Sequence, residues 1–157
     1  QLLIGTRDLG TARYRDGELR AVPSSGSEVE AFLAPLGEDI AARLDAFDLT
    51  GALERIWEVV RGLNRHVETT APWQLAKDDA RADELDRVLY DLVDGLRAVA
   101  VALASYLPET SARILEALGQ PPTINWGEVA YGQTRAVEGL APAEPLFPRI
   151  DEPAPAA

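Results

Sequence analysis

Residues 81–107 read RADELDRVLYDLVDGLRAVAVALASYL, and this stretch decides the fold of the 157-residue chain. Its apolar residues recur at spacings of three, four, seven and eight, along one stripe of a helix: Leu85, Val88, Leu89, Leu92, Val93, Leu96, Val99, Ala100 and Leu103. The charged residues take the other faces: Arg81, Asp83, Glu84, Arg87, Asp91, Asp94 and Arg97. So long an amphipathic helix must pack against others, which predicts a helix bundle.

The segments before and after this helix carry signals of their own. Pro108 closes the long helix and opens another over residues 108–118, with Gly119 just past its end. At the start of the chain, residues 1–14 are interpreted as the tail of a truncated helix and residues 16–26 as a loop.

Two further helices are predicted in the first half of the chain. Ser27 and Glu30 have the capping-box spacing and open a helix that Pro35 must kink or restart. Residues 50–68 form the next helix, with Thr50 as its expected N-cap. Its apolar stripe consists of Leu53, Ile56, Trp57, Val60, Leu63 and Val67. We therefore expect an all-α protein, an antiparallel bundle of about five helices.

The helical pattern fails after Gly119, where prolines become frequent. We expect residues 1–120 to form the bundle and residues 121–157 to form an extended tail that packs on it. The last residues, 152–157, are expected to be disordered.

The composition excludes several kinds of site. The chain has no cysteine, which excludes disulfides, thiol catalysis and cysteine-ligated zinc, and fits a reducing compartment. With His66 as its single histidine it cannot form a histidine-rich metal cage, so we expect no metal site. No apolar run approaches the roughly 20 residues that cross a bilayer, and no signal peptide is recognisable, so a cytoplasmic protein is expected. The absence of methionine and the start at Gln1 suggest a fragment of something longer.

The charge distribution bears on possible partners. The net charge of −11 disfavours nucleic-acid binding, because phosphate contacts need lysine and arginine. The acids are unevenly placed, however, with eight of them between Glu28 and Glu58. The opening segment is basic and carries Arg7, Arg13, Arg15 and Arg20. A locally neutral or basic face is therefore compatible with the acidic body.

No motif for catalysis is recognisable. The chain lacks a glycine-rich phosphate loop, a Ser-His-Asp set and a paired-histidine helix motif. Its carboxylates fall almost entirely on polar helix faces, and His66 lies on a helix flank beside Arg65. We therefore expect no catalytic residue in this chain.

The unusual stretch is NRHVETTAPWQLAK, residues 64–77, where one helix ends and Pro72 begins a short new one. Trp73, at its second position, offers a surface on which a nucleic-acid base can stack, and a helix start offers free N–H groups. The alternative, which physics alone favours, is that Trp73 fills the gap between two helices. Asn64 falls in step with the apolar stripe, which predicts a buried asparagine that ties the backbone.

This block resembles the pattern N-(R/K)-Y-(V/I/F)-x-x-x-x-P-W-x-L-x-K of methionyl-tRNA synthetases. Residues 89–119 are similar to that family's long helix and the proline-opened helix after it, which ends in L-G. RYRDGEL at residues 13–19 and PLFPRI at residues 145–150 also recur there. The similarity follows the same order over nearly the whole chain.

The resemblance implies a helical domain set after the catalytic Rossmann domain of a class I synthetase. Such a domain binds the anticodon loop of methionine tRNAs, so that a separate catalytic domain, outside this chain, charges them. ATP and Mg²⁺ belong to that catalytic domain, and no cofactor is expected here. The expected partners are the tRNA anticodon loop and the enzyme's own catalytic domain, with no membrane and no DNA.

Four candidate tRNA-binding residues follow from the resemblance: Trp73, Arg7, Asn64 and Arg65. Trp73 matches the tryptophan that stacks on an anticodon base. Arg7 is the natural match for an arginine of the first helix that reads the first anticodon base. The family has an asparagine four residues before that arginine, whereas this chain has Leu3.

Two alternatives stay open at this point. One is the equivalent helical domain of another class I synthetase, such as those for valine, isoleucine, leucine or cysteine. The other is a helical protein-interaction module without RNA binding. The net charge suits that module better, yet it leaves Trp73 and the arginines of the opening segment unexplained.

Overall fold

The computed structural model describes residues 26–122, 124–134 and 145–147. Its regular elements, all helical within these residues, are α2 (Glu28–Leu33), α3 (Leu36–Asp45), α4 (Leu49–Thr70), α5 (Pro72–Leu75), the 3₁₀ turn η1 (Asp79–Arg81), α6 (Ala82–Leu103), α7 (Pro108–Ala117) and the 3₁₀ turn η2 (Trp126–Glu128). The predicted all-α fold is thus confirmed. The helix expected over residues 1–14 lies outside the described residues. None of the helices described is long and apolar enough to cross a membrane.

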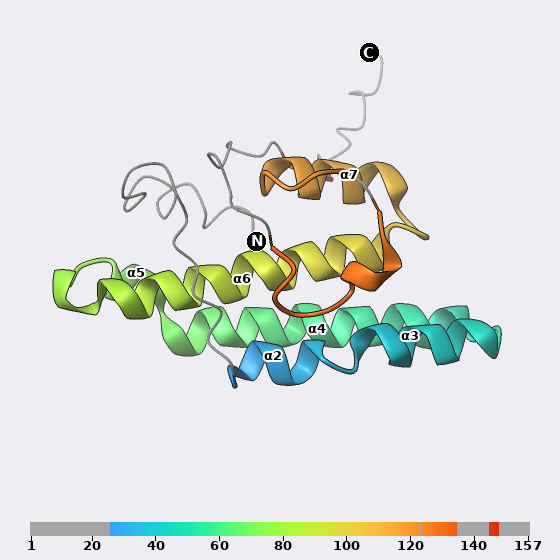
Figure 1. Cartoon of the computed structure of the whole chain (residues 1–157), viewed down its shortest axis with the longest axis horizontal. Coiled ribbons are helices and arrows are strands. Elements are labelled where there is room, and N and C mark those ends of the chain that lie inside the picture. Colours follow the sequence, from blue (N-terminus) through green and yellow to red (C-terminus); the bar gives the residue numbers. More distant parts are fainter. Residues whose placement is uncertain (1–25, 123, 135–144, 148–157) are drawn as a thin grey trace, which may run out of the picture.

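The two 22-residue helices α4 and α6 lie side by side and antiparallel (Figure 1). Helices α2 and α3 pack along α4, and α7 packs against α6 on the side away from α4. A helix of this length spans about 33 Å, so the bundle has two well-separated ends. We call the end where α5 links α4 to α6 the α5 end, and the end with the α3–α4 and α6–α7 connections the far end.

The core lies between α4, α6 and the shorter helices. Leu63 of α4 is fully buried, and a Cβ added at Gly95 of α6 would lie 2.4 Å from its side chain. A glycine at that position therefore allows the two long helices to approach closely. Of the predicted apolar stripe of the long helix, Leu92 is 8% exposed, whereas Leu96 is only partly buried against the core.

The helix starts show which local sequence signals predict a helix boundary correctly. The Ser27 hydroxyl accepts a hydrogen bond from the Glu30 N–H at 3.0 Å, and α2 stops before Pro35, so both of these predictions are confirmed. Helix α4 is capped by Asp48 instead of Thr50, because the Asp48 carboxylate accepts from the Gly51 N–H at 2.8 Å. The Asp48 N–H also donates to the carbonyl of Arg43, and the N-cap of α4 lies two residues earlier than predicted.

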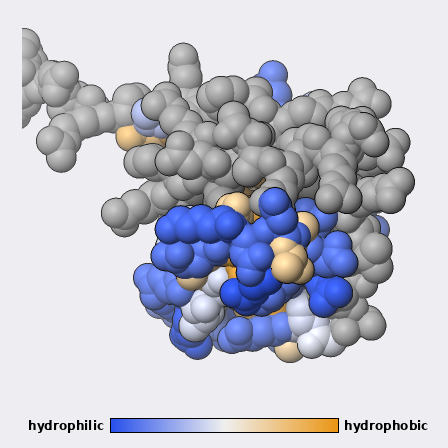
Figure 2. Space-filling model, turned by 90° about the vertical axis from the view of Figure 1, so that its left-hand side faces the viewer, coloured by the Kyte–Doolittle hydropathy of each residue, from blue (hydrophilic) through white to orange (hydrophobic). Residues whose placement is uncertain are grey.

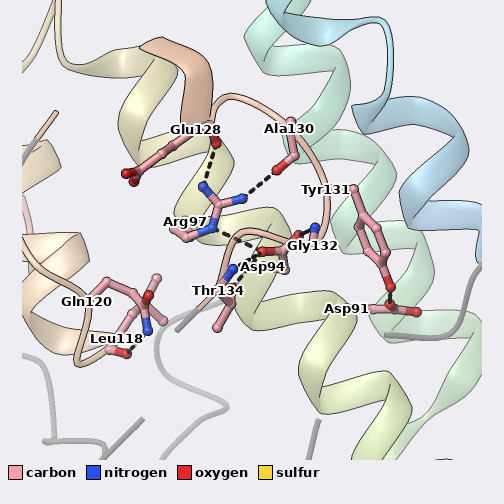
Figure 3. A network of polar contacts seen from close by, with 10 residues as sticks. All are labelled: Asp91, Asp94, Arg97, Leu118, Gln120, Glu128, Ala130, Tyr131, Gly132 and Thr134. Atoms are coloured by element: carbon pink, nitrogen blue, oxygen red, sulfur yellow. Dashed lines mark hydrogen bonds and ion pairs between the residues drawn. The ribbon is translucent and has the colours of Figure 1, made fainter. Parts of the chain in front are cut away.

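The prediction that Asp91, Asp94 and Arg97 lie on solvent-facing sides of the long helix is wrong. Their exposures are 4%, 0% and 1%. The cause is the tail segment, residues 124–134, which passes over this face of α6 (Figure 3). Its backbone groups hydrogen-bond to the charged side chains and replace the water that a solvent-facing position would have.

Arg97 and Asp94 are the centre of this contact. The Arg97 guanidinium donates to the Asp94 carboxylate at 3.0 Å and to the carbonyls of Glu128 and Ala130, each at 2.5 Å. Asp94 also accepts from the backbone N–H groups of Gly132 and Thr134, at 2.6 and 2.9 Å. A buried ion pair with this many additional hydrogen bonds holds the tail segment firmly on α6.

Candidate functional site

The site predicted at residues 64–77 is built around a sharp change of direction between α4 and α5. Ala71 has a left-handed backbone, with φ 43° and ψ 60°, and its N–H donates to the Val67 carbonyl at 3.0 Å. This residue ends α4, and Pro72 then starts α5 with its φ already suited to a helix. The junction thus has one defined geometry.

Trp73 lies on the outside of this junction. Its neighbours Pro72 and Leu75 are buried and anchor α5 in the bundle, whereas Trp73 is 47% exposed. The interpretation of Trp73 as a plug between two helices does not fit a half-exposed side chain. An indole held on an anchored backbone and open to solvent on one side is a suitable platform for stacking a planar group.

In the last turn of α4, two threonine side chains bond to the backbone of the same helix. The Thr69 hydroxyl donates to the carbonyl of Arg65 at 2.8 Å, and the Thr70 hydroxyl donates to the carbonyl of His66 at 2.6 Å. Each hydroxyl thus bonds back to the carbonyl four residues earlier, so it finds its partner on the helix itself. Hydrogen bonds to the backbone therefore continue from the turn that carries Arg65 to Ala71, two residues before Trp73.

Asn64 and Arg65 are both exposed, so the prediction of a buried asparagine is wrong. The buried face of α4 follows Ile56, Val59, Leu63 and His66, which differs by about one residue from the predicted stripe. The reason is that α4 packs on two sides, against α6 and against α2 and α3. Trp57, also predicted for the stripe, is 48% exposed.

Three α4 residues at spacings of four and three, Trp57, Arg61 and Asn64, therefore share an exposed face. The amide of Asn64 can both donate and accept hydrogen bonds there, and Arg61 and Arg65 supply positive charge near the C-terminal end of α4. Sequence reasoning did not single out Arg61 as a site residue, although its spacing of three from Asn64 would have indicated it.

Among the residues that the structure describes, the surface of the α5 end is predominantly hydrophilic, with few apolar residues among the polar ones (Figure 2). Lys77 follows α5, and its ammonium group donates to the Gln74 side chain at 3.1 Å. Arg7, the fourth candidate, lies outside the described residues. Among the residues described, no three histidine, aspartate or glutamate side chains gather in a way that could hold a metal ion.

His66 lies on the inner side of the same helix turn. It is 7% exposed, and its two ring nitrogens lie 3.9 Å from carboxylate oxygens of Glu28 and Asp91. Burial raises the pKa of the Asp91 carboxyl, and the hydrogen bond from the Tyr131 hydroxyl partly opposes that shift. This cluster joins α2, α4, α6 and the tail segment behind the exposed face.

Curated relatives of the chain are methionine–tRNA ligases. The chain is 31% identical over 144 residues to that of Caldanaerobacter subterraneus subsp. tengcongensis and 33% identical over 143 residues to that of Clostridium acetobutylicum. Each match covers 88% of this chain and 22% of the relative, so the chain spans about a fifth of these relatives' length. No family model matches the chain.

Solved structures with this fold are methionyl-tRNA synthetases of Mycobacterium tuberculosis. The apo form superimposes with a TM-score of 0.79 at 27% identity, over 97% of this chain and 32% of that one. The form bound by methionyl-adenylate gives a TM-score of 0.77 at 26% identity, over 94% of this chain and 30% of that one.

Proposed function

The chain is homologous to a segment of the methionine–tRNA ligases, and on that premise we propose that it is the anticodon-binding domain of such an enzyme. In this proposal the domain recognises the anticodon loop of methionine tRNAs. A catalytic domain outside this chain, which uses ATP and Mg²⁺, attaches methionine to the bound tRNA. The domain supplies recognition and no catalytic residue.

The observation that carries the proposal is the half-exposed Trp73 on the anchored α4–α5 junction. Proteins read single-stranded loops by splaying bases out and stacking them on aromatic side chains. A stacked base contributes about 1–3 kcal/mol to binding. Because the backbone on both sides of Trp73 is fixed by buried residues, little conformational entropy is lost when a base stacks on the indole.

The exposed residues of α4 provide the polar part of the interface. Asn64 can donate and accept hydrogen bonds at a base edge, and Arg65 can pair with a base edge or a phosphate. Arg7 is proposed as a further tRNA contact on the resemblance of its segment to the family. Such contacts position the loop so that the anticodon base reaches Trp73.

The test is Trp73→Ala in the full-length enzyme, compared with Trp57→Ala as a control. Trp57 is equally exposed, at 48%. It shares a face of α4 with Asn64, but it lies about 20 Å from the C-terminal end of the helix, where Trp73 follows. Loss of one stack should raise the KM for tRNA roughly tenfold to a hundredfold, while methionine activation without tRNA stays unchanged. Trp57→Ala should change neither. A well-folded Trp73→Ala enzyme with an unchanged KM for tRNA would contradict the proposal.

A protein-interaction module without RNA binding predicts a different result. The parent enzyme would then charge tRNA equally well whichever anticodon the tRNA carries, and Trp73→Ala would affect only contacts with another protein. Comparing charging of methionine tRNA with charging of the same tRNA carrying an altered anticodon separates these two functions.

A further inference from the structure

The far end carries large apolar side chains in contact with solvent. Phe47 and Leu49, before and at the start of α4, are 91% and 59% exposed, and Leu107, between α6 and α7, is 39% exposed. The Tyr106 hydroxyl donates to the Leu49 carbonyl at 2.9 Å, which ties the two connections together. We call Phe47, Leu49 and Leu107 the far-end patch.

The conformation of the turn at position 47 gives no reason for a phenylalanine there. Its φ of 58° is left-handed, a conformation in which a bulky side chain is strained and glycine or asparagine is favoured. The turn is held by backbone hydrogen bonds from the N–H groups of Phe47 and Asp48 to the carbonyls of Leu44 and Arg43. Any residue could make these bonds, so the ring contributes almost nothing to packing within the described residues.

We propose that the far-end patch is the surface on which the catalytic part of the enzyme docks. This inference rests on the proposed function. Because the chain spans 22% of its relatives' length, most of such an enzyme lies outside it and must be held in a fixed relation to the bundle. An exposed apolar centre is the anatomy of a protein interface.

Two further observations favour this occupant. Trp73 and the patch lie at opposite ends of α4, about 33 Å apart along its axis, so docking at the far end leaves the Trp73 side free for RNA. The patch is bordered by the Arg43–Asp48 ion pair, with N and O atoms 3.2 Å apart and both side chains nearly half exposed. An apolar centre beside a polar border suits a contact within one protein better than a face for a polyanion.

Hydroxyl-radical footprinting tests the proposal directly, because it reports the solvent accessibility of individual side chains. Phe47 should react strongly in the 157-residue chain and lose most of that reactivity in the full-length enzyme. Trp73 should react in both and serves as the internal control. Equal reactivity of Phe47 in the two proteins would overturn the proposal. Protection of Phe47 in the 157-residue chain that grows with its concentration would assign the patch to a second copy instead, and would overturn it too.

A variant separates docking from folding and from RNA binding. Phe47→Gly removes the ring and relieves the left-handed strain, so the melting temperature of the 157-residue chain should stay the same or rise. In the full-length enzyme it should lower the rate of tRNA charging without changing the affinity for an anticodon stem-loop. Ile124→Ser, at a 50% exposed apolar residue outside the patch, is the control and should change neither the charging rate nor the affinity for the stem-loop.

Unchanged charging with Phe47→Gly would count against docking at this surface. If the parent bound no stem-loop, the proposed function would fail, while the footprint would still decide the docking.

Discussion

The two ends of α4 each present an aromatic side chain to solvent, but they hold it in opposite ways. At the α5 end the left-handed residue is Ala71, whose side chain is small, and Trp73 follows on a short helix anchored by buried neighbours. At the far end Phe47 itself is left-handed and 91% exposed. A stacking platform needs a fixed orientation, which the α5 end provides. A ring that inserts into a partner surface needs exposure, which the far end provides.

The two ends keep a fixed relation only if the bundle between them is rigid, and Asp94→Ala is the change that should disturb the bundle most. It removes the buried carboxylate that pairs with Arg97 and accepts from Gly132 and Thr134. An unpaired arginine would be left buried, which costs about 3–5 kcal/mol in the free energy of unfolding. Chemical denaturation of the 157-residue chain measures this loss. Stability equal to the parent's would show that the tail segment does not hold α6.

Trp73→Ala should have the next largest effect, about 1–3 kcal/mol, and in binding alone. Because the side chain is half exposed and its anchors Pro72 and Leu75 are retained, the melting temperature should fall little. Thermal melts and stem-loop titrations of the same variant distinguish a stacking tryptophan from a structural one. A fall of many degrees with affinity lost only in step with unfolding would indicate a structural tryptophan.

Phe47→Gly should have a smaller effect and the opposite sign. A left-handed conformation costs a non-glycine residue roughly 1–2 kcal/mol, and the extra freedom of glycine in the unfolded chain returns about 0.5–1 kcal/mol of that. The free energy of unfolding should therefore rise by up to about 1 kcal/mol, as measured by urea denaturation. A destabilised variant would show that the Phe47 ring packs within the bundle, against its 91% exposure.

Asp91→Asn should have the smallest effect, confined to the pH dependence of stability. Burial raises the pKa of Asp91 in the folded protein, because the ionised carboxylate is disfavoured there. Ionising Asp91 therefore lowers the free energy of unfolding, and this cost is absent at low pH, where the carboxyl is protonated. That cost develops as the pH rises from the ordinary range of an aspartate, near 4, through the raised value. Relative to the parent, the variant should gain stability as the pH rises through that window. A constant difference at all pH values would contradict the assignment.

The sequence was sufficient for those parts of the fold that depend on local pattern. The 22-residue helix α6 was predicted because its apolar residues repeat over about five turns, and α2 because Ser27 lies three residues before Glu30. Trp73 was singled out from the helix break at Pro72 and the resemblance of its block, and its 47% exposure meets the condition that a stacking role requires. Its role in binding stays a prediction.

Contacts between segments far apart in the chain could not be predicted in this way. The burial of Asp94 and Arg97 depends on a tail segment more than 30 residues later, which has no periodic pattern. Asn64 was predicted on the buried face of α4, but it is exposed. Helix α4 packs against α6 on one side and against α2 and α3 on another, and the spacing of its apolar residues does not show where the buried surface ends. The far-end patch gave no signal because a single phenylalanine in a turn is not a motif.

Binding of an anticodon loop at the α5 end through Trp73 can be measured by titration with RNA. The 157-residue chain is titrated with a stem-loop carrying the methionine anticodon and with one carrying an unrelated anticodon, and Trp73 fluorescence is isolated by replacing Trp57 and Trp126 with phenylalanine. We expect the methionine stem-loop to quench the fluorescence of Trp73 and to bind more tightly than the unrelated stem-loop. Equal binding of both stem-loops, or binding that leaves the fluorescence of Trp73 unchanged, would contradict it.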